Sequence, residues 1–88
     1  MNSRRTKRFL DLYRRLPEIV RNQAVENYGI WKSNPWHPSL RFKKVHTSEE
    51  IWSVRINRDF RALCHIIDGT AVWFWIGSHD EYEQLLGK

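Results

Sequence analysis

Apolar residues recur every three or four positions in two early segments of the chain, residues 6–16 and the segment from Pro17 to about Lys32. This spacing is typical of helices that bury one face. Proline suits the first turn of a new helix but interrupts an existing one, so Pro17 separates the two helices. Asn34-Pro35 ends the second helix. The pattern therefore predicts two antiparallel helices joined by a tight corner at Leu16-Pro17.

The period of the apolar positions changes to two after the loop of residues 35–38. Alternation of this kind predicts a strand that begins at residue 40 and another over residues 52–57. Two further apolar segments, residues 61–67 and 70–76, flank Asp68-Gly69, which is a strong hairpin signal because both turn positions need positive φ. We expect an α+β fold in which the two helices pack on an antiparallel sheet of about four strands.

A two-residue loop at Asp68-Gly69 would set the register of the last hairpin, with Leu63 opposite Phe74 and Ala62 opposite Trp75. The two tryptophans of this hairpin would then share one face of the sheet. Two helices cover only the other face. We therefore expect the tryptophan face to be covered by another part of the chain, such as the C-terminal segment, or to be partly exposed for a partner. The two expected faces hold Trp73 and Trp75 on one side, and Leu63, Ile67, Val72, Phe74 and Ile76 on the other.

The length of 88 residues predicts a single domain, residues 1–88, whose small core is helped by five Trp, four Phe and three Tyr. The net charge of +5 is unevenly distributed, because residues 1–23 carry seven basic and two acidic side chains while residues 68–88 carry one basic and four acidic. A basic field of this size attracts polyanions, although it is also common in proteins without such a partner. Charge alone therefore leaves nucleic-acid binding open.

Cys64 is the only cysteine, which excludes an internal disulfide and favours a reducing compartment. It lies in an apolar segment, so we expect a buried thiol rather than a nucleophile. The four histidines lack the spacing of a zinc site, and the sequence predicts neither a metal nor a cofactor. No apolar segment reaches membrane-spanning length and no signal peptide is present, so we expect no membrane partner and a cytoplasmic location.

Three polar clusters carry candidate chemistry, although each by itself is also typical of a solvated strand face or a capped turn. Sheet geometry brings the end of the last strand close to the turn at residues 57–61, so the clusters can share one concave face. Cations, an imidazole and a phenol together suit RNA cleavage without a metal, in which the 2′-hydroxyl attacks the adjacent phosphate. The clusters are Arg41, Lys43 and Lys44; Arg55, Arg58 and Arg61; and His79 and Tyr82 with the acid pair between them.

The loop between the second and third predicted strands leaves one point of geometry open. A four-residue loop at residues 57–60 would place Arg55 and Arg61 on opposite faces of the sheet. A five-residue loop, or a bulge, would place both arginines on one face. Both alternatives fit the sequence.

The order of short motifs along nearly the whole chain resembles the RelE/ParE superfamily of toxins from type II toxin–antitoxin pairs. The resemblance implies two N-terminal helices on an antiparallel sheet of about four strands, preceded by a short first strand. It also implies a cognate antitoxin as partner. The motifs are LP (16–17), NPWHPSLRFKKV (34–45), WSVRI (52–56), FRAL (60–63), DG (68–69), WFWIG (73–77) and SHDEY (78–82).

The resemblance also implies roles for individual residues. Arg55 and Arg61 match positions that hold and stabilise the scissile phosphate, His79 would transfer a proton, and Tyr82 would orient or donate. We expect backbone phosphates to be bound by Lys43, Lys44, Arg41 and Arg58, and Trp36 and Trp73 are weaker candidates for stacking on a base. The chain departs from the family at Asp80, where a basic residue often follows the histidine, and at Pro38 and Ser39, where some ribonucleases place a glutamate. Glu49 or Glu50 is a candidate substitute for that glutamate, although a role in the surface loop is the stronger expectation for both.

RelE-like members of the superfamily cut messenger RNA in the ribosomal A site, which predicts a metal-independent mRNA endoribonuclease that inhibits translation. ParE-like members instead poison DNA gyrase without nuclease chemistry. A third alternative is a decayed toxin that serves only to bind its antitoxin.

Overall fold

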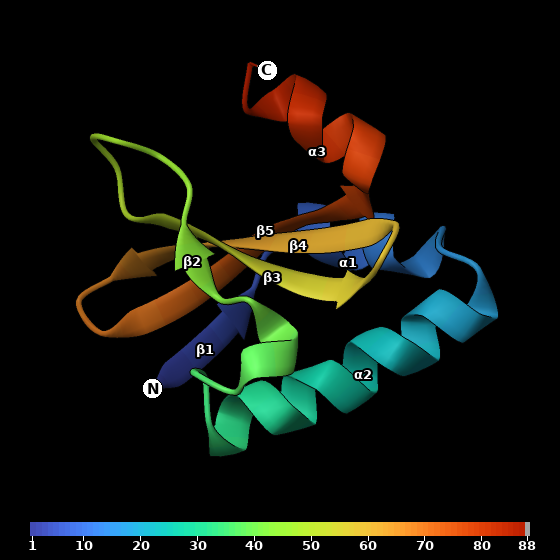
Figure 1. Ribbon diagram of the computed structural model, residues 1–88, viewed down its shortest axis with the longest axis horizontal. Helices are drawn as coiled ribbons and strands as arrows, with labels where there is room; N and C mark the ends of the chain where they lie inside the picture. The colour runs from blue at the N-terminus through green and yellow to red at the C-terminus, as the bar shows by residue number, and fades with distance from the viewer. Residues whose placement is uncertain (88) are drawn as a thin grey trace.

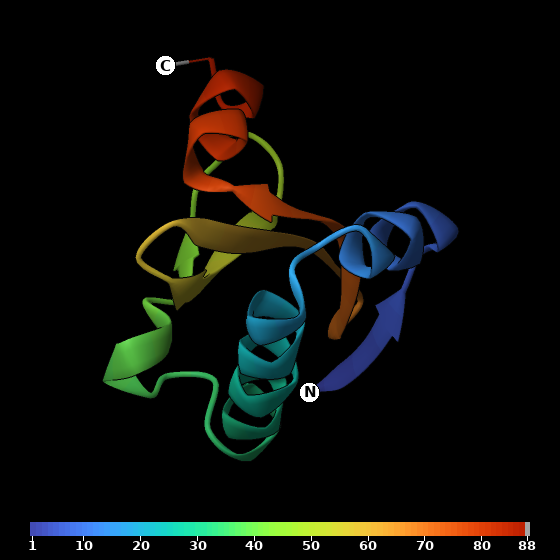
Figure 2. The ribbon, with the colours of Figure 1, turned by 90° about the vertical axis from the view of Figure 1, so that its right-hand side faces the viewer.

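A five-stranded sheet separates two helices on one side from a third helix on the other (Figures 1 and 2). The computed structural model describes residues 1–87. The strand order is β1-β5-β4-β3-β2, with β1 parallel to β5 and the other pairs antiparallel. The elements are β1 (Asn2–Arg5), α1 (Lys7–Arg14), α2 (Glu18–Ser33), the 3₁₀ turn η1 (Pro38–Leu40), β2 (Lys43–Lys44), β3 (Ile51–Asn57), β4 (Phe60–Ile67), β5 (Thr70–Ser78) and α3 (His79–Leu85). The predicted α+β class is confirmed, and β1 is the short first strand that the resemblance implied.

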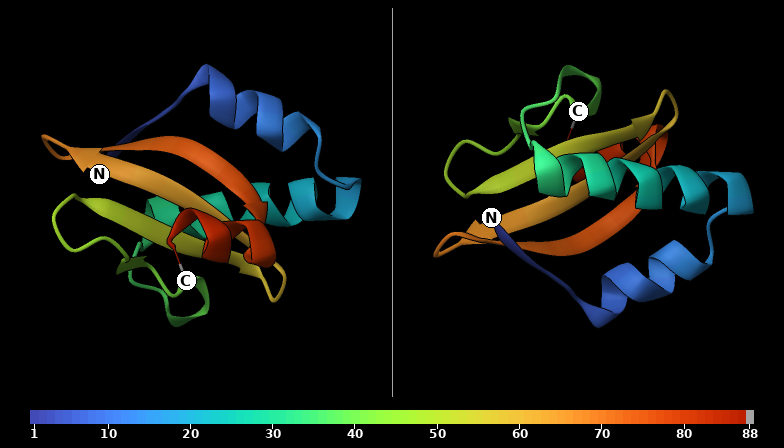
Figure 3. Two further views of the ribbon diagram at one scale, coloured as in Figure 1. Left: turned by 90° about the horizontal axis from the view of Figure 1, so that it is seen from above. Right: turned by 90° about the horizontal axis from the view of Figure 1, so that it is seen from below.

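The two N-terminal helices run in opposite directions under the sheet, α1 along β5 and α2 under β3 (Figure 3). Thr6 caps α1 by accepting a hydrogen bond from the Phe9 amide at 3.1 Å. Pro17 is the N-cap of α2, which confirms the predicted corner. The apolar face of α2 ends in Trp31, which is 1% exposed and packs edge-on against Phe42 and Trp73. These aromatic contacts form the centre of the main core.

The strand predicted to begin at residue 40 starts later and is shorter. Pro38–Leu40 form a 3₁₀ turn, Arg41 has a left-handed backbone (φ 46°), and only Lys43–Lys44 pair with β3. The turn forms because the amides of Leu40 and Arg41 donate to the carbonyls of His37 and Pro38. The turn, and not a strand face, buries Leu40. The prediction of a strand from residue 40 is therefore wrong, although Leu40 and Phe42 are both buried as their alternation suggested.

The β4–β5 hairpin turns at Asp68 and Gly69, whose φ angles of 49° and 76° confirm the predicted two-residue loop. The predicted register holds only near the turn. A bulge follows, because Trp73 pairs with Cys64 while Trp75 pairs with Leu63, so Phe74 is one extra residue in β5. The prediction that Trp73 and Trp75 share a face is therefore wrong.

The bulge divides the two tryptophans between two cores. Trp73 lies with Ile76 in the main core under α1 and α2, whereas Trp75 packs on the other face with Leu63 and Tyr82. The predicted grouping of Leu63, Ile67, Val72, Phe74 and Ile76 on one face fails for the same reason. Gly77 permits the second core, because a Cβ there would lie 2.6 Å from the Trp75 ring.

Helix α3 covers this second face, so the expectation that the C-terminal segment would do so is confirmed. A capping box begins the helix: Ser78 accepts from the Glu81 amide at 3.2 Å and its own amide donates to the Glu81 carboxylate at 3.2 Å. Tyr82 is the buried residue of the helix. Within residues 1–87, none of the helices combines the length and apolar character needed to span a membrane.

Candidate functional site

A hollow of about 100 Å³, which we call the cationic hollow, opens between α3 and the neighbouring face of the sheet. Four of its side chains are basic and one is acidic, so the electrostatic field in the hollow attracts anions. Six of the eight residues predicted as site residues line it. Its lining consists of Arg41, Lys43, Ser53, Arg55, Arg61, His79, Tyr82 and Glu83.

The β3–β4 pair brings two of the arginines together. Arg55 lies directly opposite Arg61, and the register shifts between Arg55 and Asn57, so Ile56 is an extra residue in β3. The bulge alternative that the sequence left open is therefore the observed one. The turn residues Arg58 and Asp59 do not have the positive φ of the usual two-residue hairpin, and the bulge adjusts the strand twist to this turn.

The Arg61 side chain is held by the backbone of its own turn. Its Nη1 donates to the carbonyls of Asn57 at 2.6 Å and Phe60 at 2.9 Å. Burial, followed by repulsion from Arg55, lowers the pKa of Arg61 below its ordinary value. A guanidinium stays charged despite such a shift, and its other nitrogens carry further donors that suit a phosphate.

Helix α3 brings three side chains to the hollow from one of its faces, since positions i, i+3 and i+4 are neighbours. His79 Nε2 lies 3.2 Å from Glu83 Oε1, and the His79 and Tyr82 rings lie 5.7 Å apart at 33°. The His79 amide donates to the Asp59 carbonyl at 2.7 Å, which connects the start of α3 to the β3–β4 turn. The start of α3 is therefore fixed to this turn, and the imidazole and the arginines line the same hollow.

Tyr82 contributes its hydroxyl from a buried position. The residue is 5% exposed, and its hydroxyl donates to Ser53 Oγ at 3.4 Å. Ser53 is itself buried and lies between Lys43 and Leu63 in the sheet. The phenol thus lies buried at the base of the hollow, next to Ser53.

Glu83 and Ser53 are the two lining residues that the sequence did not single out. The capping box Ser78-x-x-Glu81 predicts a helix that begins at residue 79, and that helix would have placed Glu83 beside His79. Ser53 could have been found from its alternation with Arg55 along β3.

Two predicted phosphate ligands lie outside the lining of the hollow. Arg58 is an exposed turn residue whose carbonyl lies 3.4 Å from Arg61 Nη1. Lys44 pairs in the sheet with Trp52, whose side chain packs on the main core, whereas its neighbour Lys43 pairs with Ser53 in the hollow. A one-residue step along a strand reverses the face, so Lys44 lies on the far side of the sheet.

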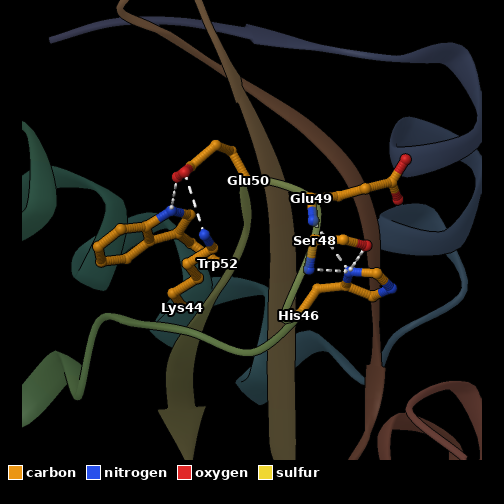
Figure 4. Close-up of polar contacts among 6 residues, drawn as sticks. All are labelled: Lys44, His46, Ser48, Glu49, Glu50 and Trp52. Carbon is orange, nitrogen blue, oxygen red and sulfur yellow. Dashed lines mark hydrogen bonds and ion pairs between the residues drawn. The ribbon is translucent and has the colours of Figure 1, made fainter.

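Figure 4 shows that Lys44 instead forms an ion pair with Glu50 in the loop between β2 and β3. The Lys44 ammonium lies 3.1 Å from Glu50 Oε1, and Trp52 Nε1 donates to Glu50 Oε2 at 3.0 Å. The Trp52 hydrogen bond, followed by that of Lys44, lowers the pKa of Glu50. Glu50 therefore holds the loop together and is not in the cationic hollow.

His46 organises the other half of this loop. Its Nδ1 accepts hydrogen bonds from the amides of Ser48 at 3.2 Å and Glu49 at 3.0 Å (Figure 4). Glu49 is also absent from the lining of the hollow, so neither candidate substitute for the family's glutamate lies there.

The two tryptophans considered for base stacking differ in exposure. Trp73 is 5% exposed in the main core, so its ring has no free face for a base. Trp36 is 61% exposed and packs on Phe42 and Trp52 with ring centroids 5.4 and 5.8 Å away.

Cys64 is fully buried as predicted, and burial raises the pKa of its thiol to about 12. Among residues 1–87, no group of three His, Cys, Asp or Glu side chains is placed to hold a metal ion.

Comparisons with known proteins agree with this architecture. The structure is similar to a chain of the RelB–RelE antitoxin–toxin complex from Methanococcus jannaschii, with a TM-score of 0.75 at 13% identity. The match covers 92% of this chain and 95% of that one. A YoeB/ParE toxin from Agrobacterium tumefaciens matches with a TM-score of 0.71 at 15% identity, covering 90% of this chain and 99% of that one. The RelBE2 toxin–antitoxin complex from Mycobacterium tuberculosis gives 0.70 at 21% identity, with 89% and 96% covered. These likenesses show a shared fold.

No curated protein sequence matches the chain. A family model described as the ParE-like toxin domain, however, matches residues 18–84, which span α2, the antiparallel strands and most of α3. The match includes every residue that lines the cationic hollow. The chain thus belongs to the ParE-like toxin domain family, and it shares the fold of the RelE toxins in these complexes.

Proposed function

We propose that this toxin is an endoribonuclease that cuts messenger RNA in the ribosomal A site and thereby stops translation. The observation that supports this proposal is the cationic hollow, where Arg55 and Arg61 lie beside the His79 imidazole. A surface that only binds has no need of a proton-transfer group. A phosphodiester cleavage site needs such a group together with cations that stabilise the charge on the phosphoryl oxygens.

In the proposed reaction the 2′-oxygen of the substrate forms a bond to the adjacent phosphorus, and the bond from phosphorus to the 5′-oxygen breaks. The 2′-hydroxyl loses a proton and the leaving 5′-oxygen gains one. The neutral His79 imidazole takes the proton of the 2′-hydroxyl, and the imidazolium that results gives a proton to the leaving 5′-oxygen, which restores the neutral ring. Glu83 orients the ring through the 3.2 Å contact at Nε2.

The cations act on the phosphate. Arg55 and Arg61 stabilise the charge that builds on the phosphoryl oxygens, and this electrostatic contribution requires donors that are already in place. Arg41 and Lys43 hold the neighbouring phosphates of the strand. Tyr82 orients the scissile group from the base of the hollow.

The proposed partners are messenger RNA on the ribosome and a cognate antitoxin, both met in the cytoplasm. Several apolar side chains of α2 are exposed, among them Ile19 and Val25, which are 68% and 60% exposed. An antitoxin with acidic and apolar residues would complement this surface and the cationic hollow.

Inducible expression tests the proposal. Expression alone should arrest growth and produce truncated messages with defined ends in primer extension, and co-expression of the neighbouring small gene should suppress both. DNA-damage signalling with intact messages would instead identify a gyrase poison. Absence of arrest would identify a module that only binds its antitoxin.

A further inference from the structure

Two amide side chains of α2 contact the β3–β4 turn from the face of the sheet opposite to the cationic hollow. Gln23 and Asn27 are one helical turn apart, at positions i and i+4, so they lie on the same side of α2. Both are half-buried. We call this pair the amide clamp.

Asn27 binds the bulge itself. Its Nδ2 donates to the Arg55 carbonyl at 3.1 Å and to the Ile56 carbonyl at 2.7 Å. A bulge disrupts the ladder of hydrogen bonds between strands, so the backbone groups at the extra residue need partners from elsewhere. Asn27 supplies these partners at Ile56, which is the residue whose insertion brings Arg55 opposite Arg61.

Gln23 binds the next residue of the turn. Its Oε1 accepts from Asn57 Nδ2 at 2.6 Å, while the Asn57 carbonyl accepts from Arg61 Nη1 at 2.6 Å. The Asn57 Oδ1 also accepts from the Asp59 amide at 2.7 Å. Hydrogen bonds thus form a continuous path from α2 through Asn57 to the Arg61 guanidinium.

We propose that Asn27, supported by Gln23, is a positioning residue for the phosphate site: it fixes the bulge that holds the Arg55 and Arg61 side chains on one anion. Asparagine is a poor helix former and position 27 faces the core, where an apolar residue would be expected. The presence of asparagine at this position is explained if its amide is needed to bind the backbone carbonyls of Arg55 and Ile56 in β3. The inference deepens the proposed nuclease function and rests on it for its biological meaning.

Phosphate binding to the purified 88-residue protein tests the clamp without depending on RNA cleavage. In Asn27→Ala the bulge loses its donor, so the affinity for inorganic phosphate should fall about tenfold, the scale of loss seen when outer supporting groups are removed from other sites. The side-chain NMR signals of Arg55 and Arg61 should shift in the same variant. Asn27→Gln keeps an amide donor and should recover part of the affinity.

Asn22→Ala is the matched control, since Asn22 is an exposed residue of the same helix. It should leave phosphate affinity and the arginine signals unchanged. Gln23→Ala provides a milder break in the same path, and it should weaken phosphate binding less than Asn27→Ala. This second variant keeps the test decisive if Asn27→Ala does not fold.

Cleavage of messenger RNA on ribosomes gives the second readout, where Asn27→Ala should be slower by about 10²-fold, as expected for a small misplacement of catalytic groups. Wild-type phosphate affinity and unmoved arginine signals in folded Asn27→Ala and Gln23→Ala would overturn the inference, even if both variants were less stable. Failure of the wild-type protein to bind phosphate would overturn it as well. A third outcome separates the two proposals. If Asn27→Ala loses phosphate binding but the wild-type protein does not cut RNA, the role of the amide clamp stands and the nuclease function is rejected.

Discussion

Arg55 lies directly across the β3–β4 pair from Arg61, so two like charges occupy adjacent positions on one face of the sheet. Like charges placed opposite each other destabilise a sheet. Burial, followed by repulsion from Arg55, lowers the pKa of Arg61, as expected where like charges lie close together. An anion that binds both guanidiniums would remove that repulsion, and this is the physical basis for the phosphate site that we propose.

Removal of the Arg61 guanidinium should abolish growth arrest without unfolding the protein. Arg61→Ala is expected to slow RNA cleavage by about 10²- to 10³-fold, the usual effect of losing one preorganised donor to a developing oxyanion. Cleavage by the purified variant on ribosomes measures this, with the unfolding midpoint as a check on folding. Arg58→Ala is the control, because it removes a guanidinium from the same turn but outside the lining of the hollow. Full toxicity of Arg61→Ala would remove Arg61 from the site.

Neutralisation of Glu83 should have opposite effects on phosphate affinity and on the rate of RNA cleavage. Glu83→Gln takes the one carboxylate out of the cationic hollow, so phosphate should bind about two- to fivefold more tightly, the range of a partly exposed ion pair. Cleavage should nevertheless be slower, because a neutral amide holds the His79 ring less strongly than the carboxylate does. Phosphate titration and single-turnover cleavage measure the two effects. Glu26→Gln on exposed α2 surface should change neither, and a variant that cleaves faster would contradict the role given to Glu83.

The helix caps offer a comparison between stability and activity. Ser78→Ala removes the cap of α3 and Thr6→Ala the cap of α1, and each should lower the free energy of unfolding by about 1 kcal/mol. Only Ser78→Ala should impair RNA cleavage, because α3 carries His79 and Tyr82. Denaturant unfolding and cleavage rates of the two variants test this. Equal loss of activity in both would mean that general stability, rather than the position of α3, controls the site.

The buried thiol of Cys64 should make stability fall at alkaline pH. Its pKa is about 12 in the folded protein and 9.0 in the reference state, so the unfolded chain loses its thiol proton first. Ionisation of the unfolded state then favours unfolding, and the contribution of Cys64 should decrease by about 1.4 kcal/mol per pH unit between these values.

Unfolding free energies of the wild type and Cys64→Ala from pH 8 to about 11 measure this effect, since the difference between the two proteins cancels the titration of other groups. A thiol reagent should also label Cys64 only after denaturation. A difference that stays constant with pH would show that the folded thiol titrates normally.

The sequence by itself determined the two N-terminal helices, the three long strands and the tight turn between the last two of them. Pro17 separates two helices through its own ring geometry, whatever the surrounding fold. Asp68-Gly69 likewise adopts the positive φ angles of its turn without contacts from distant elements. Leu40 and Phe42 show the limit of such patterns, because their burial follows a period of two although a 3₁₀ turn buries the first of them. Most residues of the hollow were also identifiable from their chemistry and from the family resemblance.

Only the tertiary structure decided which of these residues meet. One extra residue at Ile56 put Arg61 on the face of Arg55, and another at Phe74 sent Trp73 and Trp75 to opposite cores. A bulge depends on contacts from distant elements, such as Asn27 of α2 at Ile56, and these contacts have no local pattern in the sequence. Because side chains alternate along a strand, each such insertion changes the face of every residue that follows it.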